Sequence, residues 1–109
     1  MSERSAIDVI VMTGELDVAG KDVLHDRLRI APTARAVLLD LTDVTYADST
    51  ALTELLRFRA EAERQNLPVA IVAASPQFDR IIRYAGLYEV FAIFDDRGEA
   101  LSYLGRPPA

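Results

Sequence analysis

Apolar and polar residues follow two different periodicities along the chain. Continuous runs of β-branched and aliphatic residues occur at Val9–Met12, Ala36–Leu41 and Val69–Ala73, as is typical of strands buried on both faces. A shorter run at Val90–Phe94 indicates a fourth strand. Segments with helical spacing follow these runs, so the pattern predicts four strand–helix units.

The first two helical segments have an apolar stripe along one side. One is expected from about Ala19 to Ile30, where Pro32 ends it, and the other from about Ser49 to Arg64. The positions expected to face the core are Val23, Leu24, Leu28 and Ala31 in the first segment and Ala51, Leu55, Phe58 and Ala62 in the second.

Capping residues mark the last two helices. Ser75 and Pro76 supply an N-cap and a first-turn proline, and Gly86 fits the position after the C-terminus of that helix. Asp96 and Glu99 have the spacing of a capping box, so a final helix is expected to begin there.

The alternation of strand and helix predicts an α/β fold, with a mainly parallel central sheet packed by helices and right-handed crossovers. The length of 109 residues fits a single domain over residues 1–109. We expect its core at about residues 7–104, with 105–109 as a tail. Because half of the residues are hydrophobic, the chain is expected to fold compactly.

Composition excludes several function classes. The absence of cysteine excludes disulfides, thiolate metal ligands and a cysteine nucleophile. The N-terminal sequence lacks the pattern of a signal peptide, and no run approaches the ~20 apolar residues of a membrane span, so a cytoplasmic protein without membrane association is expected. The net charge of −5 argues against direct nucleic-acid binding.

The acidic and basic residues of the second helical segment alternate, which is typical of a solvated face with salt bridges. Those residues are Glu54, Arg57, Arg59, Glu61, Glu63 and Arg64.

Asp48, Ser49 and Thr50 stand directly before an apolar helical pattern, and two interpretations are open. All three residue types are preferred helix N-caps, which alone would explain them. A phosphate on a hydroxyl at this position would also be stabilised by the helix dipole and free amides. It would add about −1.5 to −2 charges without melting the fold, and so would act on a partner.

No combination of residues predicts catalysis, a cofactor or a metal site. His25, the only histidine, is expected on a solvated helix face, which leaves a zinc site or a catalytic triad without support. Asp40 lies inside an apolar strand and is expected near a strand end or bound to backbone amides. A receiver domain needs an acidic pair after the first strand and a later lysine, whereas Lys21 is the only lysine here. Nucleotide-binding glycine motifs are absent.

Leu52 and Leu56 lie to one side of the core stripe. The simpler interpretation is that they widen the buried face; if exposed beside Ser49, they would anchor a partner. Tyr84, Leu87 and Tyr88 could contribute to such an anchor as well, although packing in the core or at its rim is expected for them.

Several short motifs together resemble the STAS domain, and more narrowly the bacterial anti-sigma factor antagonists, or anti-anti-sigma factors. The resemblance runs from about Ile7 to Leu104. The motifs are Gly14–Asp17, Leu39–Leu41, Tyr46–Thr50, Ser75–Pro76 and Ala85–Leu87.

The resemblance implies a non-enzymatic regulator of sigma-factor-dependent transcription with about four β/α turns. Its partner would be an anti-sigma factor with serine kinase activity, which phosphorylates Ser49 or, as the lesser candidate, Thr50; a serine phosphatase would reset it. The residues implied or considered for partner binding are Asp17, Asp48, Ser49, Thr50, Leu52 and Leu56.

The chain departs from the family pattern after the hydroxyl residues, where Ala51–Thr53 replaces Gly-Leu-Gly. The alternative is therefore a STAS scaffold or ligand-responsive module, which works in a stress-signalling complex without phosphorylation.

Overall fold

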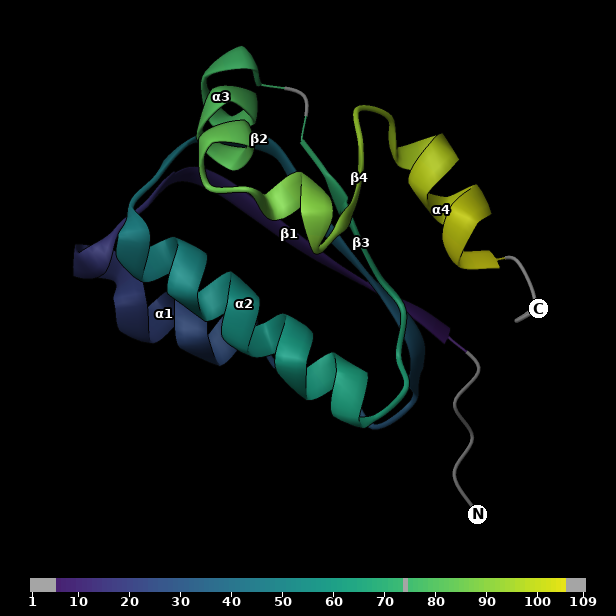
Figure 1. The fold of residues 1–109 in the computed structure, drawn as a ribbon. Coiled ribbons are helices and arrows are strands. Elements are labelled where there is room, and N and C mark those ends of the chain that lie inside the picture. Colours follow the sequence, from purple (N-terminus) through teal and green to yellow (C-terminus); the bar gives the residue numbers. More distant parts are fainter. Residues whose placement is uncertain (1–5, 74, 106–109) are drawn as a thin grey trace.

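The computed structural model describes residues 6–73 and 75–105, in which strands and helices alternate (Figure 1). The elements in chain order are β1 (Ala6–Leu16), η1 (Val18–Gly20), α1 (Lys21–Arg27), β2 (Ala34–Ala47), α2 (Ser49–Arg64), β3 (Val69–Val72), α3 (Pro76–Tyr84), η2 (Leu87–Glu89), β4 (Ala92–Phe94) and α4 (Arg97–Gly105).

The four strands form one sheet in the order β1-β2-β3-β4, and every neighbouring pair is parallel. The predicted α/β class with a parallel sheet is therefore confirmed. Alternate residues of β2 point to opposite faces of the sheet, where Leu38 and Leu39 belong to different apolar clusters. Both clusters are buried, which explains why this central strand is a continuous apolar run.

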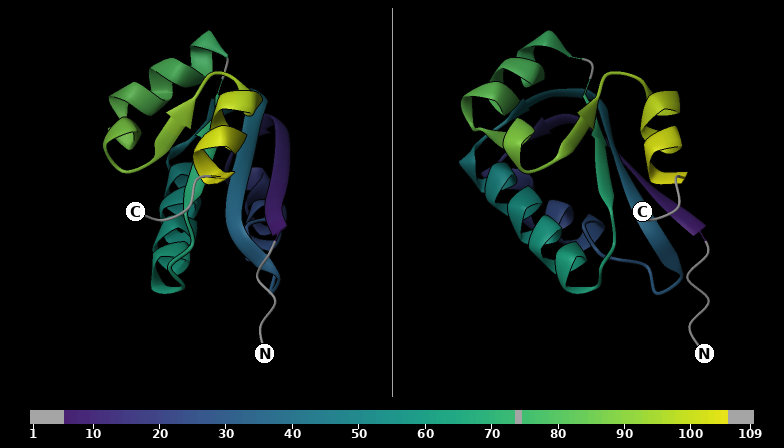
Figure 2. Two further views of the ribbon diagram at one scale, coloured as in Figure 1. Left: turned by 90° about the vertical axis from the view of Figure 1, so that its right-hand side faces the viewer. Right: turned by 45° about the vertical axis from the view of Figure 1, so that its right-hand side comes forward.

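Helices cover the two faces of the sheet unequally. α1, α2 and α3 lie on one face, and α4 lies on the other (Figure 2). The small cluster beneath α4 is built from Ala36, Leu38, Ala70, Val72, Ala100 and Leu104.

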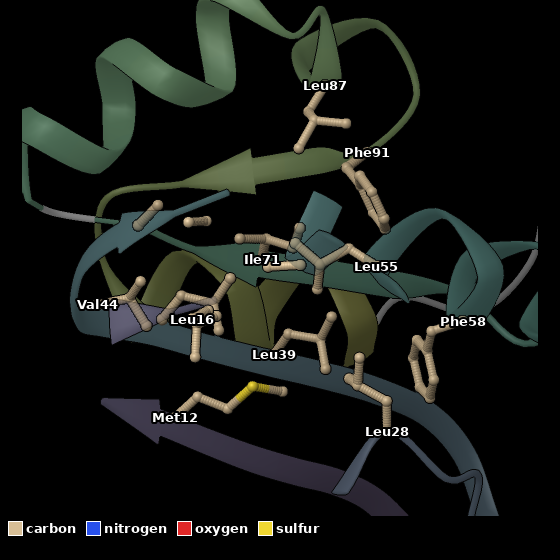
Figure 3. Packing of buried hydrophobic residues seen from close by; sticks show 14 of the residues in the cluster. Met12, Leu16, Leu28, Leu39, Val44, Leu55, Phe58, Ile71, Leu87 and Phe91 are labelled. Atoms are coloured by element: carbon tan, nitrogen blue, oxygen red, sulfur yellow. The ribbon is translucent and has the colours of Figure 1, made fainter. Parts of the chain in front are cut away.

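The main core fills the space between the sheet and the three helices (Figure 3). Leu39 and Ile71 of the central strands contact the side chains of α2, which contributes Leu55 and Phe58, both fully buried. The stripe predicted for α2 is confirmed, because Ala51 and Ala62 are buried as well. Burial of this stripe fixes which side of α2 remains available at the surface.

Both strands at the start of the sheet are longer than predicted. The apolar runs predicted strands that end at Met12 and Leu41. Instead β1 continues to Leu16 and pairs with β2 through Ala47. Gly14 adopts a left-handed φ of 79° beside a register shift, so the strand continues past this residue with a local irregularity.

The first helical segment was predicted as one helix over 19–30, but it is divided into η1 and the seven-residue α1, which ends at Arg27. Leu24 and Leu28 are buried as expected, whereas Val23 is 65% exposed. The prediction for Val23 was wrong because this short segment contacts the core through Leu24 and Leu28, which lie four positions apart on one side of the helix.

The caps predicted for the later helices are present. The Ser75 hydroxyl accepts the Phe78 N–H at 3.3 Å, and Gly86 has the left-handed φ of 74° expected after a helix. Asp96 accepts the Glu99 N–H at 2.9 Å at the start of α4. The predicted tail lies outside the described residues from position 106 onward.

Candidate functional site

Asp48 organises the N-terminus of α2. Its Oδ1 accepts the N–H of Ala51 at 3.0 Å, which caps the helix, and its Oδ2 accepts the N–H of Val18 at 2.9 Å. Its own N–H donates to the Leu16 carbonyl at 3.0 Å. One residue therefore fastens the start of α2 to the end of β1, and both carboxylate oxygens are used for this purpose.

Asp17 also lies at the junction where the end of β1 meets the start of α2. It precedes Val18 in the chain, and its side chain accepts the N–H of Gly20 at 3.3 Å, so it caps η1. The parallel pairing of β1 with β2 brings Leu16 opposite Ala47, which places Asp17 and Asp48 together at the carboxyl ends of these two strands. Both are among the residues that the resemblance implies for partner binding.

Ser49 is the first residue of α2 and is exposed, whereas Thr50 is half-buried. The Ser49 backbone carbonyl accepts a hydrogen bond from the Thr53 hydroxyl at 2.9 Å. A hydroxyl in this position can be reached by another protein, while a charge placed on it would sit beside Asp48. The structure thus ranks Ser49 above Thr50 by exposure.

Leu52 and Leu56 share a helix face with Ser49, at the spacing i, i+3 and i+7. Leu56 is exposed and Leu52 is half-buried. Leu52 lines a cavity of about 300 Å³ between α2 and α3. The other lining residues are Arg80, Ile81, Tyr84 and Ala85.

Tyr84 was expected to pack in the core or at its rim, but it is 96% exposed. It is the last residue of α3, where the chain leaves the helix, and so its ring has no core to pack against. The expectation held for Leu87, which is buried. Packing was the favoured interpretation for Tyr84 because the apolar period does not show that this residue ends the helix.

His25, Glu54 and Arg57 form a cluster between α1 and α2 that was not predicted. Glu54 was expected on a solvated face, yet it is buried, and its Oε1 lies 2.9 Å from both His25 Nδ1 and Arg57 Nε. Burial raises the pKa of Glu54, but the hydrogen bonds from His25 and Arg57 together lower it by more. The pKa of Glu54 therefore lies below its usual value. The cluster holds α1 against α2.

Asp40 lies within β2, not near its end, and is buried. It accepts the backbone N–H of Thr42 at 3.0 Å, as the sequence suggested, and also binds the Arg97 side chain on α4. Burial raises the pKa of Asp40, but the hydrogen bonds from Thr42 and Arg97 outweigh that effect and lower it. This pair fastens α4 to the sheet.

The described residues contain no group of three or more histidine, aspartate or glutamate side chains that could hold a metal ion. Nor does any helix within residues 6–73 and 75–105 combine the length and apolarity needed to cross a membrane.

Comparison with known proteins identifies relatives of this chain. The family model described as Mlab, STAS domain matches residues 1–94. A STAS-domain containing protein of Pseudomonas aeruginosa is 31% identical over 85 residues, which cover 77% of this chain and 84% of that protein.

Solved structures with the same fold include proteins described by different roles. A sulfate transporter family protein from Wolinella succinogenes matches with a TM-score of 0.78 and 20% identity, covering 90% of this chain and 84% of that one. An anti-sigma factor antagonist from Mycobacterium paratuberculosis matches with a TM-score of 0.77 and 23% identity, covering 90% and 85%.

Proposed function

Because the chain belongs to the STAS-domain family, we propose that it is an anti-sigma factor antagonist without enzymatic activity of its own. It binds an anti-sigma factor that is also a serine kinase, and so releases a sigma factor for transcription. Phosphorylation of Ser49 ends this binding, and a serine phosphatase restores it. The protein acts in the cytoplasm, with no direct contact to nucleic acid or membrane.

The observation that carries the proposal is the exposure of Ser49 at the first position of α2, beside the Asp48 carboxylate that caps this helix. A kinase needs an accessible hydroxyl, and a partner needs a surface that changes on modification. Thr50 is the lesser acceptor because it is half-buried.

Electrostatics explains how the phosphate would act. The helix dipole and free N-terminal amides stabilise an anion at Ser49, so the domain stays folded. The carboxylates of Asp48 and Asp17 are already in the junction, and a phosphate adds about −1.5 to −2 charges to them. A partner that binds over Ser49 must then bury several like charges, which weakens its binding.

The rest of the partner surface follows the exposed side of α2. Leu52 and Leu56 lie on the same face as Ser49, and Tyr84 stands beside Leu52 at the cavity between the helices. Exposed apolar and aromatic side chains around a pocket are typical anchors of protein interfaces. Arg80 at the same cavity supplies a cation for an acidic residue of the partner.

The test compares two variants that add one carboxylate to the same helix. Ser49→Asp is expected to weaken binding to a purified anti-sigma factor kinase by at least about tenfold in a calorimetric titration. Ala60→Asp is the control, because Ala60 is exposed on α2 about 16 Å further along the helix. Equal affinity of Ser49→Asp and wild type would refute the phosphorylation switch.

One alternative function is favoured by a specific observation. The chain has Ala51 and Thr53 where the antagonist pattern has glycines, and Ala51 is fully buried in the helix. A STAS scaffold or ligand-responsive module in a stress-signalling complex would use the same surface without a kinase. Absence of phosphate on Ser49 in protein isolated from cells under several growth conditions, with the partner still bound, would favour this alternative.

A further inference from the structure

The two edges of the sheet differ greatly in length. β4 forms one edge with three residues, whereas β1 forms the other with eleven. Within the described part of the chain, β1 pairs with β2 alone, and it lies along the border of the sheet in Figure 2. A long edge strand with a free side is a template for another strand, and proteins usually keep such edges short or covered.

The side chains of β1 that face α4 are not covered by that helix. Ile10 and Met12 belong to the main core, so Val9 and Val11 point to the opposite face. There Val9 is 38% and Val11 41% exposed, because α4 packs mainly over β2 and β3. The edge therefore has an open apolar strip on this face.

A groove follows the other face of the same edge. A cavity of about 350 Å³ lies between the second half of β1 and α1, and its floor includes the buried side chains of Met12, Leu16 and Leu24. Val23, which faces away from the core, forms part of its wall. This volume is within the range of sites that accept small apolar groups.

The Val11 carbonyl faces the outer side of the edge strand. It accepts a hydrogen bond from Arg27 Nη2 of α1 at 2.6 Å, so a side chain and not a strand satisfies it. The N–H of an added strand would replace Arg27 as the donor to this carbonyl.

The charges at the edge are mainly negative. Glu15 and Asp17 line the groove together with one cation, Arg27, and Asp8 lies on the strand itself. Within residues 6–73 and 75–105, neither Asp8 nor Glu15 forms an ion pair. A second copy of this chain would bring the same acidic strand against them, whereas a basic segment would be attracted.

We propose that β1 is a docking edge for an extended segment of another protein, in which apolar and basic residues alternate. The segment adds a strand beside β1, with main-chain hydrogen bonds for affinity. Its apolar side chains all point to the face of Val9 and Val11 and cover them. Its basic side chains point to the other face, where their alkyl stems lie over Met12 and Leu16 and their charged ends pair with Glu15 and Asp8.

The test uses capped synthetic peptides with the full chain. A peptide of alternating lysine and valine is titrated while backbone amide exchange is followed by NMR, and a glutamate–valine peptide is the charge control. The expected result is that amides of β1 exchange at least about tenfold more slowly with the lysine peptide. Glu15→Lys should weaken its binding several-fold, while Glu89→Lys, an exposed position in η2 near the opposite edge, should not.

Other results would overturn the proposal. These are no binding, equal binding of the glutamate peptide, or binding that leaves β1 exchange unchanged. A concentration-dependent dimer of the protein alone, disrupted by Val9→Lys in sedimentation experiments, would assign the edge to a second copy instead. None of these readouts depends on Ser49, so they leave the proposed function to its own test.

Discussion

The carboxylate of Asp48 accepts the backbone N–H of Val18 at 2.9 Å, although the two residues lie 30 positions apart. The same side chain caps α2, so it links the end of β1 to the start of the helix. This relationship explains why an acidic residue precedes Ser49. Asp48 has a structural role in linking β1 to α2, and its negative charge beside Ser49 is a consequence of that role.

Asp48→Ala is expected to lower the free energy of unfolding by about 1–2 kcal/mol, because a helix cap and a bond to Val18 are both lost. Asp48→Asn should cost less, since its single amide oxygen can keep one of the two bonds. Urea unfolding measures both effects. Asp43→Ala is the control at an exposed position, expected within about 0.5 kcal/mol of wild type.

The Asp40–Arg97 pair predicts a pH dependence of stability. The pKa of Asp40 in the folded protein lies below its usual 3.8, because hydrogen bonds from Thr42 and Arg97 outweigh its burial. The unfolded chain thus binds a proton first as pH falls. The stabilisation is complete above pH 3.8 and is lost as pH falls from there through the lowered pKa.

Unfolding free energies measured between about pH 7 and about pH 3 should show this loss. Asp40→Asn should have a shallower decline over the acidic part, with a remainder from Glu54, whose pKa is lowered in the same sense. An identical decline in wild type and Asp40→Asn would contradict the assignment.

His25→Ala should reduce the free energy of unfolding by about 1 kcal/mol, because the buried carboxylate of Glu54 loses one of its two donors. Asp26→Ala on the same helix should have little effect, since its ion pair with Arg29 is exposed. A double-mutant cycle of His25→Ala with Glu54→Gln separates this contact from other effects, and a coupling energy of zero would show that the contact contributes nothing.

Tyr84→Ser should leave stability within about 0.5 kcal/mol of wild type, because the ring is 96% exposed. It should nevertheless weaken binding of the partner if the cavity beside Leu52 is an anchor point. Tyr103→Ser on α4 is the control for binding, because it lies over the opposite face of the sheet. Equal loss of binding in both variants would argue against a localised surface.

Much of this fold could be predicted from the sequence because local signals and packing agree. The period of α2 and its cap at Asp48 gave the bounds Ser49–Arg64 that the structure has. The ends of β1 and β2 could not be predicted, since their pairing at Leu16 and Ala47 depends on residues far apart in the chain. No local pattern contains that information.

The positions of the candidate site residues follow from the order of strands and helices. Asp17, Asp48 and Ser49 lie together because they follow the carboxyl ends of two paired parallel strands. Burial of Glu54 was missed, because its partner His25 lies on another helix and a charged residue on a helix usually faces solvent. The exposure of Tyr84 depends on where α3 ends, which its apolar period does not specify.

A capture experiment shows whether modification of Ser49 controls partner binding. Wild type and Ser49→Asp are used as paired baits in a lysate of the source cells, and mass spectrometry identifies the captured proteins and any phosphate on the wild-type bait. The expected result is an anti-sigma factor kinase held by wild type and lost from Ser49→Asp, with phosphate on Ser49 after ATP is added. Equal capture by both baits, with Ser49 unmodified, would contradict it.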